Sequence, residues 1–67
     1  MSEAKQKVGH LIREARVKAG LTQQELGDKL GVGRATVNGY ETGKQNLTVD
    51  TLEKVAKALG VELKINL

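Results

Sequence analysis

The sequence predicts an all-α domain of four short helices followed by one β-strand. Apolar residues recur at helical spacing in successive stretches, and a glycine follows each of these stretches. The last residues, VELKINL, instead alternate apolar and polar side chains, which is the period of a half-buried strand. Together these patterns indicate one domain, residues 1–67, that ends in a strand over residues 61–67.

The composition limits the kinds of site that the chain can hold. A chain of 67 residues is one small domain with a thin hydrophobic core. It has no Cys and one His, which excludes disulfides and a Cys/His zinc site. We expect no metal, no cofactor and no small-molecule substrate. Because the core is thin, we expect association with a partner chain to add to the stability of the fold. The 11 Lys and Arg against 8 Asp and Glu give a net charge of +3, which slightly favours an anionic partner.

The distribution of apolar residues predicts no membrane segment. No apolar run approaches the roughly 18 residues that a membrane-spanning helix needs. The N-terminal segment, MSEAKQKVGH, lacks the apolar stretch of a secretory signal. We therefore expect a cytoplasmic protein with no membrane partner.

The first two helices are predicted from an apolar face and a capping motif. One face of the first helix collects Val8, Leu11, Ile12, Ala15 and Ala19. Gly20 then ends the helix, because glycine readily adopts the left-handed conformation found after a helix C-terminus. Thr22 begins the second helix as a capping box with Glu25, in which each residue satisfies the backbone amide of the other. This helix runs to about Leu30, and Gly31 ends it.

The third helix is expected over residues 33–41, with Val37 and Tyr40 facing inward. Inside a helix, Gly33 and Gly39 each cost about 1 kcal/mol relative to Ala, so the order of this helix must come from packing. Gly33 avoids that cost if it serves as the N-cap. A turn over residues 42–44 follows this helix.

The fourth helix is capped by Thr48 and ended by Gly60. Its apolar face is predicted to contain Val49, Leu52, Val55, Ala56 and Leu59. The strand that follows has its apolar face at Val61, Leu63, Ile65 and Leu67. Because an unpaired strand leaves its backbone donors and acceptors open, we predict that two chains pair these strands and form a homodimer. The alternative is that the tail frays or folds back on its own domain.

Residues 22–41 have the features of a helix-turn-helix. Such a unit needs a small residue where its helices nearly touch, a sharp turn between them, and apolar anchors on both. Gly27 is the small residue and Gly31 makes the turn. The apolar anchors are Leu26, Leu30, Val32, Val37 and Tyr40.

This region resembles the phage-repressor-like helix-turn-helix family, also called the Cro and lambda-repressor or xenobiotic-response-element type. The segments that carry the resemblance are LIREARVKAGLTQQELGDKLGV, ATVNGYETGK and LEKVAKALGV, between about Leu11 and Val61. The resemblance implies a helical core that docks its third helix in the major groove of double-stranded DNA while the second crosses the phosphate backbone. It therefore implies a sequence-specific transcriptional regulator that binds a palindromic site as a dimer, with repression as the expected outcome.

The family positions also imply roles for single residues. The base-reading positions are occupied by Arg34, Ala35, Asn38 and Gly39. The positions that contact the DNA backbone are occupied by Thr22, Gln23, Thr36, Thr42 and Lys44. Arg can donate two hydrogen bonds to O6 and N7 of guanine, and Asn can hydrogen-bond N6 and N7 of adenine. An Ala methyl can contact the thymine methyl. The alternative for Arg34 is an exposed residue paired with Asp28 or another neighbouring carboxylate.

Two positions depart from the family pattern. Gly39 stands where the family usually has a longer side chain that reaches a base or phosphate, and Gly33 replaces a common Ser or Thr cap. We therefore expect modest sequence specificity and a recognition helix that settles only on binding. By family position, Arg16 and Glu41 form a partly buried ion pair, and we interpret Tyr40 as core filler.

Other functional classes find little support in the sequence. His10 and Glu14 share a helix face, but a single His beside a Glu is usually a solvated surface pair, and we expect no enzyme. The segment GVGRATVNG has no Lys-Ser or Lys-Thr that would make it a phosphate-binding loop. The alternative function is that of an antitoxin, which binds a toxin protein as well as its operator. Against it, the chain ends at Leu67 without the long polar tail that many antitoxins use.

Overall fold

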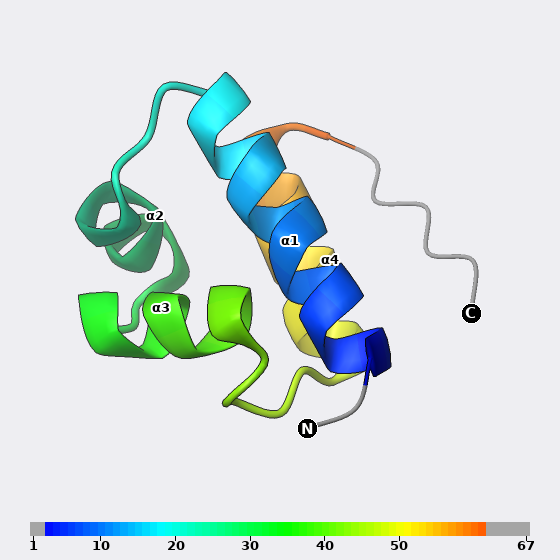
Figure 1. The fold of residues 1–67 in the computed structure, drawn as a ribbon. Coiled ribbons are helices and arrows are strands. Elements are labelled where there is room, and N and C mark those ends of the chain that lie inside the picture. The colour runs from blue at the N-terminus through cyan, green and yellow to red at the C-terminus, as the bar shows by residue number, and fades with distance from the viewer. Residues whose placement is uncertain (1–2, 62–67) are drawn as a thin grey trace.

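The fold is that of a computed structural model, which describes residues 3–61 of the chain (Figure 1). Four helices occupy these residues: α1 (Glu3–Lys18), α2 (Gln23–Leu30), α3 (Arg34–Thr42) and α4 (Val49–Leu59). Both α1 and α2 pack against α3 and α4. The predicted helical core is confirmed. The predicted strand, residues 61–67, lies outside the described residues except for Val61, whose side chain is exposed.

The helix ends follow the caps that the sequence predicts. Glycines with φ between 67° and 79° follow the helices: Gly20, Gly31, Gly43 and Gly60. Thr48 Oγ1 accepts a hydrogen bond from the Thr51 amide at 3.1 Å, as expected of a helix cap. α3 begins and ends one residue later than the approximate range, residues 33–41, that the sequence predicts, and the prediction that Gly33 can serve as the N-cap is confirmed. Gly33 is the N-cap, with φ −80°, and so avoids the cost of a helical glycine.

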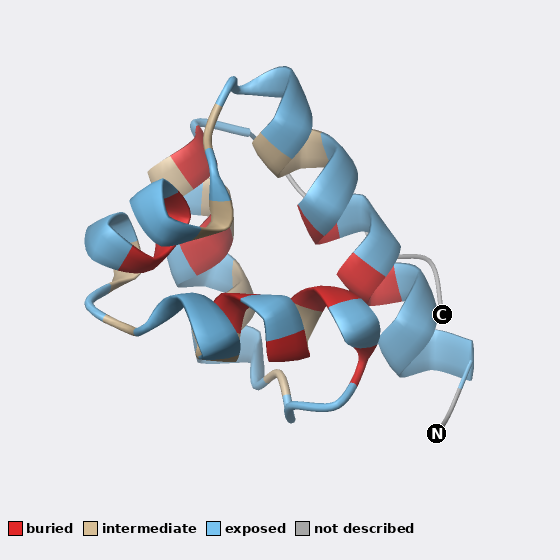
Figure 2. Cartoon of the chain, turned by 60° about the vertical axis from the view of Figure 1, so that its left-hand side comes forward, coloured by how far each residue is buried: buried red, intermediate tan, exposed pale blue. Residues whose placement is uncertain are grey.

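The core consists of side chains from all four helices, on the sides of the helices that face one another (Figure 2). Ile12, Leu26, Val37 and Val55 are 0% exposed, and Val8 and Leu59 are also buried. Tyr40 is half-buried and packs against this cluster, as predicted. The helical spacing therefore identified every buried apolar side chain of the described residues.

Three residues that we assigned to the apolar faces of helices are exposed. Val49 is 71% exposed because it lies about 120° around the α4 axis from Val55, at about 100° per residue. Leu11 is 38% exposed for the same kind of reason, since it lies about 100° from Ile12, the centre of the buried face of α1. Ala19 is exposed because it follows Lys18, the last residue of α1.

Two glycines allow helices to approach at backbone distance. A Cβ atom on Gly27 would lie 2.7 Å from the Val32 carbonyl oxygen, so only glycine fits at this point of the helix-turn-helix, as predicted. A Cβ atom on Gly9 would lie 2.7 Å from the Tyr40 carbonyl oxygen and even nearer to that of Glu41. The sequence interpretation did not foresee this second contact. It brings α1 directly onto the backbone of α3.

An ion pair joins the same two helices beside this contact. Arg16 Nε donates to Glu41 Oε2 at 2.6 Å, and Arg16 Nη2 donates to Glu41 Oε1 at 3.2 Å. Arg16 Nη1 donates to the Leu21 carbonyl oxygen at 2.8 Å. The two side chains are 12% and 3% exposed, respectively. The ion pair implied by the family resemblance is therefore present, and it is buried and bidentate.

We expect Glu41→Ala to lower the free energy of unfolding by about 3 to 5 kcal/mol, because it leaves the Arg16 guanidinium buried without a carboxylate. Urea denaturation followed by circular dichroism measures this loss. The control is Glu14→Ala, which removes an exposed carboxylate from α1 and should change stability by less than about 0.5 kcal/mol. Equal effects of the two substitutions would contradict a structural role for the buried pair.

Candidate nucleic-acid interface

The turn between α2 and α3 sets two helices at a fixed angle with little chain between them. Gly31 is left-handed, with φ 74°, and its amide donates to the Gly27 carbonyl oxygen. The Val32 amide donates to the same oxygen at 2.9 Å. Gln23, in the first turn of α2, contacts Asn38 in the middle of α3 through a 3.2 Å hydrogen bond. The N-terminal end of α2 therefore lies beside the exposed face of α3.

The predicted capping box at the start of α2 is confirmed. The Glu25 amide donates to Thr22 Oγ1 at 3.0 Å, and the Thr22 amide donates to Glu25 Oε1 at 3.0 Å. The hydrogen bond from the Thr22 backbone amide is the main cause that lowers the pKa of Glu25 below its ordinary value of 4.5, and the Thr22 hydroxyl adds to it. A fixed first turn keeps the remaining free amides of α2 pointing outward, where an anion can bind.

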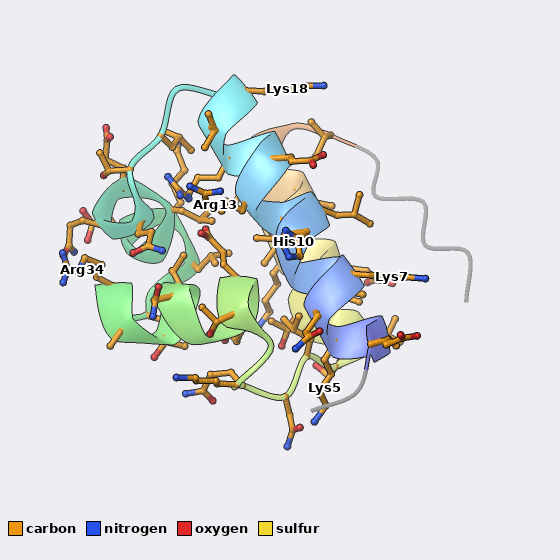
Figure 3. The ribbon with its side chains drawn as sticks, viewed as in Figure 1. Lys5, Lys7, His10, Arg13, Lys18 and Arg34 are labelled. Atoms are coloured by element: carbon orange, nitrogen blue, oxygen red, sulfur yellow. The ribbon has the colours of Figure 1, made fainter. Side chains whose placement is uncertain are left out.

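Three of the four predicted base-reading residues share one exposed surface of α3. Arg34, Ala35 and Asn38 are all exposed. Arg34 extends away from the body of the protein at the N-terminal end of α3 (Figure 3). Within residues 3–61, the Arg34 guanidinium has no hydrogen bond or ion pair, and Asp28 instead accepts a hydrogen bond from Gln24. The alternative prediction that Arg34 pairs with Asp28 is therefore wrong.

Gly39, the fourth predicted reader, is buried and does not lie on this exposed surface. A Cβ atom at this position would overlap Cγ of Gln45, whose stem occupies the space that a longer residue 39 would fill. The Gly39 carbonyl oxygen accepts from the amides of Lys44 and Gln45 at 2.9 and 3.1 Å. Sequence reasoning predicted the turn over residues 42–44 but missed Gln45, because nothing in its type or spacing indicates that its side chain covers Gly39.

The residues predicted to contact phosphates differ in how many donors they have left. Lys44 is exposed and Thr36 is half-buried, and neither side chain has a hydrogen bond within the described residues. The Thr42 hydroxyl donates to the Asn38 carbonyl oxygen at 2.9 Å, so its one proton is already used within α3. Gln23 Nε2 lies 3.2 Å from both Asn38 Oδ1 and Glu41 Oε1. Both of its protons are therefore used in hydrogen bonds within the protein.

A cleft of about 450 Å³ that is lined by polar and charged residues adjoins the exposed face of α3. It is lined by Gln6, His10, Arg13, Gln23, Asn38, Glu41 and Thr42. Arg13 points from α1 toward α2, and His10 lies one turn earlier on α1 (Figure 3). Sequence reasoning missed Gln6 and Arg13, although their spacing relative to His10 puts all three on one helix face. The cleft offers donors to a polar or anionic group.

The described residues lack the features of a metal site and of a membrane span. No group of three His, Cys, Asp or Glu side chains in residues 3–61 is arranged to hold a metal ion. His10 and Glu14, which share a face of α1, are both exposed, and no hydrogen bond joins them. No helix in this part of the chain is long and apolar enough to span a membrane.

A family model described as Helix-turn-helix matches residues 12–65. The chain belongs to the helix-turn-helix family. The match includes α2, α3 and the turn between them, and it confirms the family that the sequence motifs indicated.

Relatives in this family include named regulators. The chain is 42% identical to the cryptic phage CTXphi transcriptional repressor RstR of Vibrio cholerae over 52 aligned residues. These residues make up 78% of this chain. The match covers 47% of that repressor, so the chain spans about half the length of this relative.

Solved structures of restriction-modification controller proteins have the same fold. The controller protein C.AhdI from Aeromonas hydrophila superposes with a TM-score of 0.80 at 37% identity, over 85% of this chain and 83% of that one. The controller protein C.Esp1396I, as a tetramer in complex with its natural 35 base-pair operator, superposes with a TM-score of 0.83 at 34% identity. That match covers 92% of this chain and 82% of the controller chain.

We expect a titration of Glu25 by carboxyl-detected NMR to give a pKa below 4.5. Because the folded-state pKa is lowered, the capping box stabilises the protein fully above the unfolded pKa, and this stabilisation is lost as pH falls through the folded pKa. Thr22→Val removes the hydroxyl and should move the Glu25 pKa part of the way back toward 4.5. The control is Glu25→Gln, whose stability should fall less than that of the wild type on acidification. A Glu25 pKa that Thr22→Val leaves unchanged would contradict the role of the hydroxyl.

Proposed function

We propose that the protein is a sequence-specific transcriptional regulator that inserts α3 into the major groove of double-stranded DNA, with repression as the expected outcome. The observation that carries the proposal is the exposed surface formed by Arg34, Ala35 and Asn38, beside the N-terminal end of α2. The phage repressor and the operator-bound controller protein among its relatives support the same function. We assign no catalytic role to the described residues.

Each residue of this surface has a chemical role in the proposal. Arg34, with its unpaired guanidinium, donates to O6 and N7 of guanine, and the Ala35 methyl contacts a thymine methyl. Asn38 contacts a purine. Because Gly39 is buried beneath Gln45, it does not contribute a reader in this proposal.

Phosphate contacts flank these base contacts in the proposal. Thr36 and Lys44 contribute side chains, and the backbone amide of Gln23 adds the donor of a helix N-terminus. Thr22 takes part only if its hydroxyl gives up its bond to the Glu25 carboxylate. Thr42 takes part only if its hydroxyl gives up its bond to α3. Such contacts fix the position of the protein on DNA without reading its sequence.

The proposal includes a homodimer that acts in the cytoplasm. Two recognition helices must lie about 34 Å apart to enter successive major grooves of a palindromic site. The support for a dimer is the alternating apolar face of residues 61–67, together with the tetrameric assembly of the C.Esp1396I controller protein. The relatives described above are repressors and controllers, and they give no support to the antitoxin alternative.

The function is tested by selection of binding sites from random duplex DNA, followed by affinity measurements at several salt concentrations. We expect an enriched palindrome and an affinity that falls steeply with salt as phosphate contacts release counterions. Arg34→Ala should weaken binding to the selected site by about 1 to 3 kcal/mol and reduce the preference for one base at a single position. Lys57→Ala, which removes an exposed charge from α4, is the control and should leave the preference unchanged. Salt-sensitive binding without any enriched sequence would contradict sequence-specific regulation.

The dimer is tested with Ile65→Lys, which places a charge on the apolar face of the predicted strand. We expect this variant to sediment as a monomer in analytical ultracentrifugation, because the charge must be desolvated in the paired ribbon. Asn66→Lys adds the same charge to the opposite face of the strand and should remain a dimer. An Ile65→Lys protein that stays dimeric would show that the dimer interface lies on another surface.

A further inference from the structure

A chain of hydrogen bonds runs from the buried ion pair to the exposed surface of α3. Arg16 donates two hydrogen bonds to the Glu41 carboxylate. Gln23 Nε2 lies 3.2 Å from Glu41 Oε1 and 3.2 Å from Asn38 Oδ1. These hydrogen bonds therefore link the Glu41 carboxylate, which is 3% exposed, to an exposed amide on α3 through one glutamine.

The ion pair fixes which end of the Gln23 amide faces inward. The Glu41 carboxylate, bound by the Arg16 guanidinium, is ionised and can only accept hydrogen bonds. If the Gln23 amide were turned over, its oxygen would face a carboxylate oxygen with no proton between them. Gln23 must therefore present its nitrogen to Glu41, whatever assignment is chosen for the two atoms of the amide.

The same reasoning fixes the next amide in the chain. The second proton of Gln23 Nε2 points to Asn38, so Asn38 must present its oxygen, which can accept. Asn38 Nδ2 is then the end of the amide that faces away from Gln23. An asparagine that is free to turn can offer either a donor or an acceptor to DNA, whereas this one offers a donor in a defined place.

We propose that Gln23 is a positioning residue that holds Asn38 so that Nδ2 donates to a base acceptor, such as N7 of a purine. This inference rests on the proposed function. It differs from the role that the family resemblance implies for the Gln23 side chain, a donor to phosphate, because both Nε2 protons are used inside the protein. Phosphate is then left to the free backbone amides at the start of α2.

The positioning predicts a specific pattern of discrimination. A cytosine at the base position read by Asn38 presents its N4 amino group, a donor, to the major groove. To accept from it, Asn38 must turn over and lose its bond to Gln23, with amide protons then facing each other. Without Gln23, Asn38 turns freely and the cytosine is tolerated.

The test compares Gln23→Met with Gln24→Met on the selected DNA site. Met has a similar length to Gln but makes no comparable hydrogen bond, and Gln24 is an exposed neighbour that bonds only Asp28 on its own helix. The base position is identified first, as the one whose preference Asn38→Ala abolishes. We expect the wild type and Gln24→Met to prefer the purine over cytosine by about tenfold or more there, and Gln23→Met by less than about threefold.

The salt dependence of binding separates positioning from phosphate contact. Gln23→Met should bind the preferred site within about threefold of wild type, with an unchanged slope of affinity against salt. A Gln23→Met protein that weakens binding to all sequences equally, or that keeps the full discrimination against cytosine, overturns the proposal.

A measurement without DNA keeps the inference testable if the variant fails to fold or the proposed function fails. In the wild-type protein, ¹⁵N relaxation should show the side-chain NH2 groups of Gln23 and Asn38 to be more ordered than that of Gln24. Gln24→Met should leave this order unchanged, and Gln23→Met should reduce it at Asn38. Ordered amides in a protein that selects no DNA would refute the regulator and retain the positioning. Mobile amides in a protein that selects DNA would refute the positioning alone.

Discussion

The buried ion pair between Arg16 and Glu41 is the interaction on which the rest of the structure depends. A domain of this size has few fully buried apolar side chains, so removing one partner of a desolvated pair takes away a large share of its stability. The pair joins α1 to α3 at the point where Gly9 lets the two helices meet at backbone distance. It therefore determines where α3 lies, and with it the orientation of the exposed surface.

Stability and the proposed DNA reading share residues in this protein. Glu41 accepts from Arg16 in the interior and from Gln23 at the edge of the cleft, and Gln23 in turn meets Asn38. A chain of hydrogen bonds in which each partner has only one allowed polarity transmits that polarity along its length. In this way a charge in the core determines which atom an exposed amide presents.

α3, the proposed recognition helix, is intrinsically weak, and its surroundings compensate for this. α3 has a glycine at its N-cap with no side-chain hydrogen bond, and a second glycine within its length. Gln45 fills the space above Gly39, and Lys5 Nζ donates to Asn46 Oδ1 at 2.7 Å, which ties the following loop to α1. The order of α3 thus comes from packing and from the loop rather than from helix propensity. This agrees with the sequence prediction that packing must supply it.

The sequence by itself determined the four helices, their caps and the buried faces, because these follow from local periodicity and from glycine and threonine at helix ends. It also identified the family and three of the four reader positions that prove to be exposed on α3, since both depend on spacing within a short motif. Only the tertiary structure decided the contact at Gly9, the covering of Gly39 by Gln45 and the polarity of the Gln23 amide. Each of these depends on residues from different elements meeting in space, and sequence spacing carries no signal of such a meeting.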